Sequence, residues 1–131
     1  MKEPIFLSLT EVIELHRLGV ERFGGTPEIR DMALLESALA MPAAGFGGQY
    51  FHTDLAAMAG AYLFHLVTNH AFVDGNKRIG AIAASTFLLI NDAEFHPSEQ
   101  EFGDMVLAVA RGEATKDDAT AFIRRHMKAE S

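Results

Sequence analysis

The sequence predicts an all-α fold, a single-domain bundle of about six helices with a short flap or hairpin near residues 43–52. Three observations predict it. Apolar residues recur at helical spacing along most of the chain. Side chains typical of helix N-caps stand before these segments, and glycine or proline often follows them. A chain of 131 residues with 49% hydrophobic residues and no obvious linker fills one core, so residues 1–131 are expected to form one domain.

The first two helices are delimited by their caps. Ser8 and Glu11 have the spacing of a capping box, and Gly24 ends the apolar periodicity that follows them. Asp31 is the expected N-cap of a short second helix, which stops before Pro42 because proline cannot continue a helix. The chain is therefore expected to begin with one longer and one shorter helix.

The third and fourth helices are the most apolar segments of the chain. Asp54 caps the third helix, whose apolar residues lie on most of its sides and predict extensive burial. Residues 79–90 contain no charged side chain, and this run is too long for a typical strand. It therefore predicts a central core helix that ends near Asn91.

The last two helices repeat the capping pattern. Ser98 and Glu101 form a second capping box, and Gly112 is the stop signal of that helix. Thr115 caps the final helix, whose C-terminal basic residues interact favourably with the helix dipole. No segment has a convincing strand pattern, so we expect no strand outside the flap region.

The segment between Pro42 and Asp54 fits no helix. Its glycines allow the positive φ angles that tight turns require, which favours a small hairpin or flap. A flexible connection between two helices is an equally good interpretation of the residues alone. The candidate flap residues are Gly45, Phe46, Gly47, Gly48, Gln49 and Tyr50.

The composition excludes several classes of function. Eleven Lys and Arg against 18 Asp and Glu give a formal net charge of -7, which disfavours duplex DNA or an anionic membrane surface as partner. The absence of Cys excludes disulfides and thiolate zinc sites and fits a reducing compartment. The start lacks a secretory signal, and the longest uncharged stretch, residues 55–73, is too interrupted by polar residues to span a bilayer. We expect a cytoplasmic protein that binds neither membrane nor nucleic acid.

The densest polar cluster lies between the two most apolar helices, in residues 69–78. One interpretation is a connection that is polar only because it reaches the surface. The other is a functional site, because its side chains suit proton transfer, metal binding and phosphate binding. The polar members are Asn69, His70, Asp74, Asn76, Lys77 and Arg78.

The start of the fourth helix has the features of an anion site. Gly75 precedes it, so a turn there can direct the free backbone amides of Asn76, Lys77 and Arg78 outward, and the helix dipole adds to the attraction. Lys77 and Arg78 lie in the first turn, where cations oppose the dipole and Asp or Glu is the usual choice. A bound polyanion explains their placement.

Two side chains beside this helix start suit phosphoryl transfer. Asp74 is a candidate ligand for Mg²⁺, which usually takes one or two carboxylates plus oxygens of the substrate. His70 belongs to the residue type best suited to general-base work near neutral pH. Together with the anion site, these groups predict transfer of a phosphoryl or nucleotidyl group to a hydroxyl.

Residues 70–78, His-Ala-Phe-Val-Asp-Gly-Asn-Lys-Arg, resemble the signature of the Fic/Doc (Fido) superfamily and closely resemble its death-on-curing (Doc) toxin branch. The similarity continues in the opening segment LSLTEVIELHRLGVERFGG and in the segments EIRDMALLESAL and FLLIND. The resemblance implies an all-helical Fido domain over residues 1–131 and a toxin of a type II toxin–antitoxin system. The helical fold agrees with the caps and periods described above.

The resemblance also implies a role for each motif residue. His70 corresponds to the base that deprotonates the target hydroxyl, Phe72 to the core anchor of the loop, and Asp74 to the carboxylate that associates with the metal. The phosphate-binding elements would be Gly75, Asn76, Lys77 and Arg78. The segment from Gly45 to Tyr50 would be the flap that docks the target, which favours a hairpin there.

Two departures from the wider family bear on the reaction. Fic enzymes that transfer AMP usually have Gly where this chain has Lys77, and a second Arg where it has Ala81. A Lys adds bulk and charge, and the missing Arg removes a bidentate phosphate clamp. The Doc branch shares this pattern and is associated with transfer of the γ-phosphate of ATP to a threonine of elongation factor Tu. We therefore rank protein phosphorylation above AMP transfer, and expect it to inhibit translation. A catalytically silent binding module is the third hypothesis.

Control of the activity is expected to come from a partner. Self-inhibited Fic proteins have a helix with Ser or Thr, then Glu four residues later, then Gly or Asn; Thr10 and Glu14 have this spacing, but Leu15 follows. Doc-type toxins are held by a Phd-like antitoxin whose C-terminal segment folds into a groove of the toxin. Outside the motif, His16 lies on an apolar helix face and is expected to be packed rather than to bind a ligand.

Overall fold

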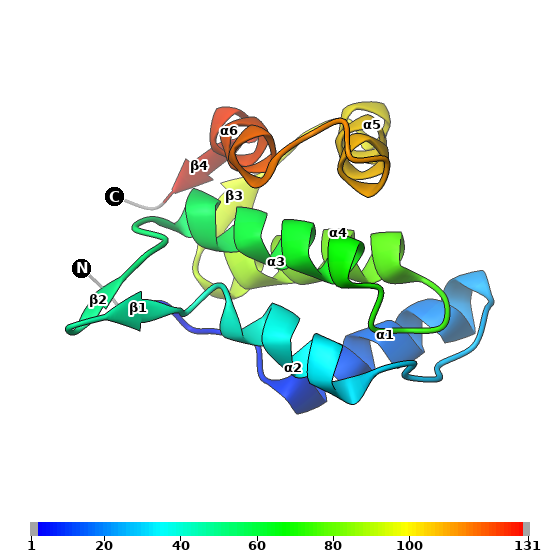
Figure 1. The fold of residues 1–131 in the computed structure, drawn as a ribbon. Helices are drawn as coiled ribbons and strands as arrows, with labels where there is room; N and C mark the ends of the chain where they lie inside the picture. Colours follow the sequence, from blue (N-terminus) through cyan, green and yellow to red (C-terminus); the bar gives the residue numbers. More distant parts are fainter. Residues whose placement is uncertain (1–2, 130–131) are drawn as a thin grey trace.

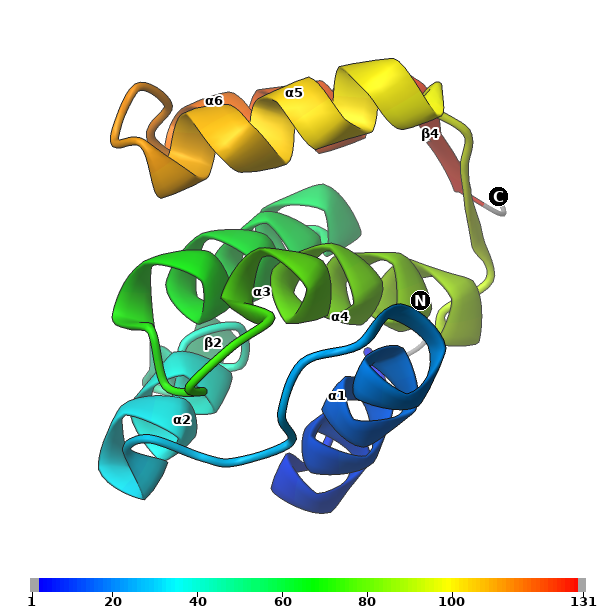
Figure 2. The ribbon, with the colours of Figure 1, turned by 90° about the vertical axis from the view of Figure 1, so that its right-hand side faces the viewer.

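The computed structural model describes residues 3–129 and has three layers, each made of two helices (Figure 1, Figure 2). Helices α3 and α4 form the middle layer, α1 and α2 cover one side of it, and α5 and α6 cover the other. The helices are α1 Leu9–Phe23, α2 Met32–Ala40, α3 Leu55–Asn69, α4 Asn76–Ile90, α5 Glu99–Ala110 and α6 Lys116–His126. The predicted all-α bundle is thus confirmed. Among residues 3–129 no helix is long and apolar enough to cross a membrane.

The five predicted N-caps are confirmed. Each of these side chains accepts a hydrogen bond from a backbone amide three residues later, at 2.8 to 3.1 Å; the caps are Ser8, Asp31, Asp54, Ser98 and Thr115. Helix α4 differs from the other five, because its N-cap is Gly75 and no side chain caps it. The exception lies at the motif that the sequence singles out.

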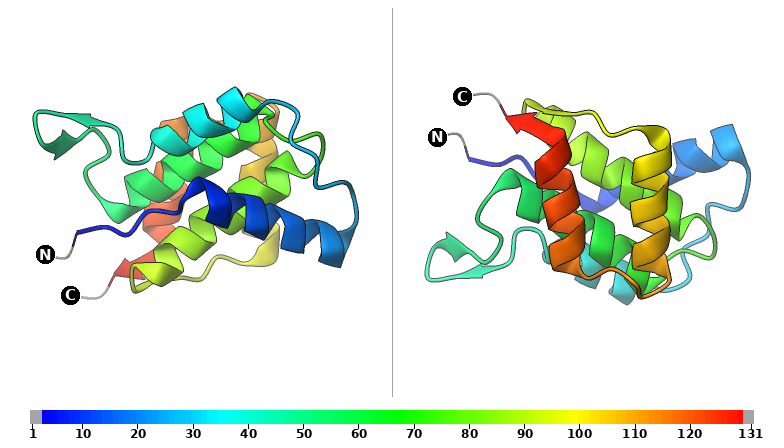
Figure 3. Two further views of the ribbon diagram at one scale, coloured as in Figure 1. Left: turned by 90° about the horizontal axis from the view of Figure 1, so that it is seen from below. Right: turned by 90° about the horizontal axis from the view of Figure 1, so that it is seen from above.

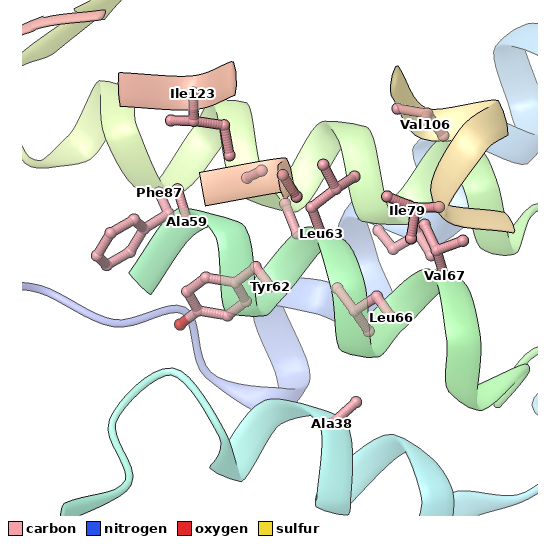
Figure 4. Close-up of a cluster of buried hydrophobic side chains, with 14 of the residues drawn as sticks. Ala38, Ala59, Tyr62, Leu63, Leu66, Val67, Ile79, Phe87, Val106 and Ile123 are labelled. Atoms are coloured by element: carbon pink, nitrogen blue, oxygen red, sulfur yellow. The ribbon is translucent and has the colours of Figure 1, made fainter. Parts of the chain in front are cut away.

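The core is built around α3 and α4 (Figure 4). Gly80 lets these two helices approach closely, because a Cβ atom there would lie only 3.1 Å from the backbone oxygen of Leu63. Side chains from the outer layers complete the core on both sides of α3. The labelled side chains are Ala38, Ala59, Tyr62, Leu63, Leu66, Val67, Ile79, Phe87, Val106 and Ile123.

Of the two interpretations of the glycine-rich segment, the hairpin is confirmed. Strands β1 (Gly45–Phe46) and β2 (Gln49–Tyr50) pair antiparallel, with Gly45 opposite Tyr50. Gly47 and Gly48 between them have φ angles of 61° and 82°, as the two central residues of a type I′ turn require. Glycine is needed here because side chains are strained at positive φ.

A second strand pair was not expected, and the prediction of no strand outside the flap is wrong. Strands β3 (Ala93–Phe95) and β4 (Met127–Ala129) pair antiparallel, with Glu94 opposite Lys128. Each strand has three residues, which is too short to show a recognisable alternation of apolar and polar side chains. The pair joins the connection after α4 to the chain after α6.

Residues 70–75, which connect α3 to α4, are called the motif loop. The hairpin and the motif loop lie at opposite ends of α3 (Figure 3). The hairpin precedes Leu55, the first residue of the helix, and the loop follows Asn69, the last. A helix of 15 residues is about 22 Å long at 1.5 Å per residue. In Figure 3 the connection between α1 and α2 lies at the same end as the loop and away from the hairpin.

Candidate active site

The motif loop is a sharp reversal between the end of α3 and the start of α4. His70 is the C-cap of α3, with φ 51° and ψ 47°, and Gly75 is the N-cap of α4, with φ 78° and ψ 21°. Both are left-handed, a conformation that costs a residue with a side chain about 1–2 kcal/mol. His70 therefore occupies a strained backbone position, and its side chain is exposed to solvent. Such strain persists only where surrounding contacts impose it.

The backbone of the α1–α2 connection imposes the path of this loop. Ala71 accepts hydrogen bonds through its carbonyl from the amides of Arg30 (2.8 Å) and Asp31 (3.0 Å). Ile29 and Phe72 form an isolated antiparallel bridge. The loop is thus held as a short extended segment against residues some forty positions earlier in the chain.

Arg30 also holds the end of α3 through its side chain. Its Nε donates to the carbonyl of His70 at 2.7 Å, and its Nη2 donates to that of Asn69 at 3.4 Å. These carbonyls belong to the helix end, where a cation also complements the dipole. Asn69 in turn donates from Nδ2 to the carbonyl of Leu34 at 3.1 Å, which ties the helix end to α2.

Phe72 and Asn76 fix the middle of the loop. Phe72 is 2% exposed, which fits the anchor role that the family resemblance implies. Asn76 accepts from the amide of Phe72 through Oδ1 at 3.1 Å and donates from Nδ2 to its carbonyl at 2.9 Å. The Asn76 side chain is therefore engaged inside the loop, and its contribution to anion binding would come from its backbone N–H.

His16 of α1 lies beneath the loop. It is 3% exposed, its Nε2 is 2.7 Å from the carbonyl oxygen of Asp74, and its ring stacks on Phe72 with centroids 3.7 Å apart. The prediction that His16 is packed is confirmed. Its contact with the motif was not predicted, because the two positions are 58 residues apart.

The start of α4 is open to an anion. The first intrahelical bond runs from Ile79 N–H to the carbonyl of Gly75 at 2.9 Å, so the amides of residues 76–78 have no helical acceptor. Helices α1, α5 and α6 carry Asp or Glu in their first turns, whereas α4 carries Lys77 and Arg78 there. An uncapped helix start with two cations is a favourable place for phosphate groups.

Lys77 is exposed, whereas Arg78 is partly held by α1. The Nη1 of Arg78 donates to the carbonyl of Gly24 at 3.3 Å, and its guanidinium lies over the ring of Phe23, 5.1 Å from the centroid. A Cβ atom at Gly75 would lie 3.6 Å from the same Nη1, so the guanidinium folds back over the helix start. The guanidinium of an arginine has five N–H donors, and the carbonyl of Gly24 accepts from one of those of Arg78.

Asp74 is exposed beside this helix start. Its Oδ1 accepts from the amide of Gly75 at 2.8 Å, and its Oδ2 faces Gly25 so closely that a Cβ atom there would collide with it. No group of three or more His, Asp or Glu side chains suited to a metal ion occurs in the described part of the chain. One exposed carboxylate fits Mg²⁺, which can take its other ligands from phosphates and water.

The flap residues are not brought to the motif loop. Phe46 at the hairpin is 84% exposed, and Tyr50 is anchored by its hydroxyl, which donates to Glu3 at 3.0 Å, and by edge contact with Phe6. The site therefore consists of residues 70–78, α1 and the α1–α2 connection. His16, Gly25 and Arg30 belong to it, although no local signal marks them in the sequence.

This chain is similar to one protein family and to known proteins. Residues 6–88 match the Fic/DOC family. The chain is similar to Toxin Doc of Mycolicibacterium smegmatis (strain ATCC 700084 / mc(2)155), with 46% identity over 72 residues, which is 55% of each protein. It is also similar to Protein kinase doc of Escherichia phage P1, with 29% identity over 119 residues, which is 91% of this chain and 93% of that protein. The chain thus spans about half the length of the first relative and most of the second.

The family match covers every residue of the candidate site. It includes α1, the α1–α2 connection, the hairpin, α3 and all but the last two residues of α4. The all-helical fold agrees with the match. This chain therefore belongs to the Fic/DOC family.

Proposed function

We propose that this protein is a Doc-like toxin that transfers the γ-phosphate of ATP to a Ser or Thr hydroxyl of a protein. The observation that carries the proposal is the start of α4, uncapped and bearing Lys77 and Arg78, next to the exposed His70. The name of the phage P1 relative, Protein kinase doc, supports phosphoryl transfer as the reaction. The substrate we propose is an elongation factor such as elongation factor Tu, whose modification would inhibit translation in the cytoplasm.

In the proposed mechanism His70 accepts the proton of the acceptor hydroxyl. The oxygen then forms a bond with the γ-phosphorus, the bond from that phosphorus to the bridging oxygen breaks, and ADP leaves. The backbone amides of residues 76–78, together with Lys77 and Arg78, would hold the phosphate oxygens through charge-assisted bonds. Asp74 would hold Mg²⁺, which when bound neutralises part of the phosphate charge.

AMP transfer is the second candidate. Lys77 occupies the first turn of α4 with a long charged side chain, and Ala81 stands one turn into the helix, where an AMP-transferring enzyme has a second arginine. An alanine cannot donate a bidentate bond to a phosphate, so we rank γ-phosphate transfer first.

The partner we propose is a Phd-like antitoxin. Its C-terminal segment would fold into a groove of the toxin, a helix-in-groove mode of recognition. The net charge of -7 favours a segment that carries basic residues. The name Toxin Doc of the mycobacterial relative supports a toxin–antitoxin pair. Co-expression with the neighbouring reading frame and co-purification of the two chains test this part of the proposal.

A labelling experiment separates the candidate reactions. The purified chain is incubated with Mg²⁺, a bacterial extract and ATP labelled at either the α- or the γ-phosphate. Transfer of γ label only, lost in His70→Ala, would support the kinase. Transfer of α label would show AMP transfer instead. Absence of both labels on every protein, and on purified elongation factor Tu, would contradict an enzyme and favour the silent binding module.

A further inference from the structure

A histidine at position 16 lowers the stability of the fold, because the position lies in the core. The residue is 3% exposed, and among residues 3–129 its Nδ1 has no hydrogen-bond partner. A buried polar atom without a partner costs about 1–3 kcal/mol. A phenylalanine would fill the same space and stack on Phe72 without this cost. The hydrogen bond made by the other ring nitrogen, Nε2, can therefore account for a histidine at this position.

That bond has a definite direction. The carbonyl oxygen of Asp74 can only accept, so Nε2 of His16 carries the hydrogen and donates it over 2.7 Å. The accepting carbonyl belongs to the peptide that links Asp74 to Gly75. This peptide joins the candidate metal carboxylate to the residue that begins α4.

The same face of α1 supports the rest of the helix start. A Cβ atom added to Gly75 would lie 3.2 Å from Nε2 of His16, so the glycine rests against the ring. One turn further along α1, a Cβ atom added to Gly19 would lie 3.1 Å from Cδ of Arg78. His16 and Gly19 are three residues apart and share a helix face. This face therefore meets both ends of the Asp74–Arg78 segment.

We propose that His16 is a positioning residue, whose Nε2–H fixes the Asp74–Gly75 peptide and so orients the Asp74 carboxylate and the open amides of α4. The backbone bonds to the α1–α2 connection lie at Ala71 and Val73, before that peptide, and Gly75 has no side chain to limit its backbone conformation. Oriented donors stabilise an anion because they need no rearrangement when it binds. The predicted effect on ATP affinity rests on the proposed function, whereas the predicted effect on the order of the loop in the nucleotide-free protein does not.

The test compares four variants of the full chain. His16→Phe and His16→Leu lack the donor, and His16→Gln retains an amide N–H that can reach the same carbonyl. Val12→Ala is the matched control, because Val12 is a buried residue of α1, one turn earlier. Hydrogen exchange of the amides of Phe72, Val73 and Gly75 is measured without nucleotide. The dissociation constant for ATP with Mg²⁺ and the melting temperature are measured in parallel.

We expect His16→Phe to melt within a few degrees of the wild type and to raise loop exchange about five- to tenfold, since one hydrogen bond is lost. ATP affinity should fall by a similar factor, and His16→Gln should restore most of both losses. Val12→Ala should lower the melting temperature and leave the loop unchanged. Unaltered loop exchange in His16→Phe, or a His16→Gln variant as impaired as His16→Phe, would overturn the proposal.

Two further outcomes are also decisive. Failure of both His16→Phe and His16→Leu to fold would show that His16 is a structural residue and would overturn the proposal. A wild type that does not bind ATP would contradict the proposed function. Loop exchange in the free protein would still judge the role of His16 in that case, so the two failures are distinguishable.

Discussion

The two ends of α3 differ in what holds the chain in place. At the C-terminal end, backbone bonds and the guanidinium of Arg30 bind the motif loop to the α1–α2 connection, and the side-chain amide of Asn76 bonds to the backbone of Phe72 inside the loop. At the N-terminal end, the hairpin is shaped by its own two-residue glycine turn, and Phe46 extends into solvent. The first structure is held largely by residues distant in the sequence, whereas the second has a local turn and distant contacts at Tyr50.

This difference fits the roles that are proposed for the two ends. A group that accepts a proton and an amide cradle that binds phosphates must be held in one geometry before the substrate arrives. A docking element must adapt to a partner, and a few local contacts are sufficient to keep it folded. The strained backbone of His70 belongs to the first kind of structure, because only surrounding contacts can maintain it.

The largest contrast between the two ends should be in catalysis. His70→Ala is expected to reduce phosphoryl transfer at least about 100-fold, because a general base contributes about 10²- to 10⁴-fold. His70→Asn should be equally inactive and better tolerated by the left-handed backbone. Phe46→Ala should leave the affinity for ATP unchanged and raise the KM for the protein acceptor. Initial rates with labelled ATP measure these effects.

A different result would contradict each of these two predictions. Substantial transfer by His70→Asn would show that another group accepts the proton. An unchanged KM in Phe46→Ala would remove the hairpin from target docking, in agreement with its distance along α3 from the loop. Melting temperatures serve as the control, since both side chains are exposed and neither change should lower them by more than a few degrees.

The next contrast is in stability. Asn76→Ala removes both side-chain bonds to the backbone of Phe72, whose amide and carbonyl then lose their partner. We expect the free energy of unfolding to fall by about 2–3 kcal/mol. Gln49→Ala in the hairpin is the matched amide deletion and should change it by less than about 0.5 kcal/mol. Denaturant titration measures both, and equal effects would show that the two ends are equally constrained.

The local parts of the fold could be predicted from the sequence. Capping boxes at Ser8 and Ser98 involve residues three apart, so their pattern is visible in a short window. The turn of the hairpin is equally local, because two adjacent glycines supply the required φ angles. The uncapped, cationic start of α4 was recognised in the same way, as an exception to local rules that the other helices obey.

The parts that join distant residues could not be predicted. The pairing of β3 with β4, the bond from His16 to Asp74 and the bond from Arg30 to His70 each depend on how the helices pack. A buried histidine on an apolar face looks the same in the sequence whether it contacts the core or a functional loop. The motif therefore predicted the candidate reacting groups, whereas their contacts with distant residues are seen only in the fold.

A smaller effect is expected when the end of α3 loses its cationic cap. Arg30→Ala removes the two guanidinium bonds to the carbonyls of Asn69 and His70. We expect a loss of about 1 kcal/mol in stability and a several-fold slower transfer. Arg30→Lys retains a cation at the helix end and should lose less. If Arg30→Ala transferred phosphate at the wild-type rate, the position of His70 would not depend on this contact.

The smallest effect should come from His65, which lies within α3 between its two ends and gives a reference for both. His65 lies 3.2 Å from Nζ of Lys116, and burial, together with the charges of Lys116 and His52, lowers its pKa from 6.5 to about 4. Below pH 6.5 the unfolded chain takes up a proton that the folded chain refuses, so stability should fall as the pH falls from about 6.5 to 4.

The size of this effect is limited by solvent. The ring is half-buried, and screening reduces the loss to about 1 kcal/mol across that range. His65→Phe removes the titrating group and should flatten the dependence of the free energy of unfolding on pH in this window. An equal slope in the wild type and in His65→Phe would assign the acid sensitivity to other groups. Because His65 is not a residue of the candidate site, the variant should also leave ATP affinity at pH 7.5 unchanged.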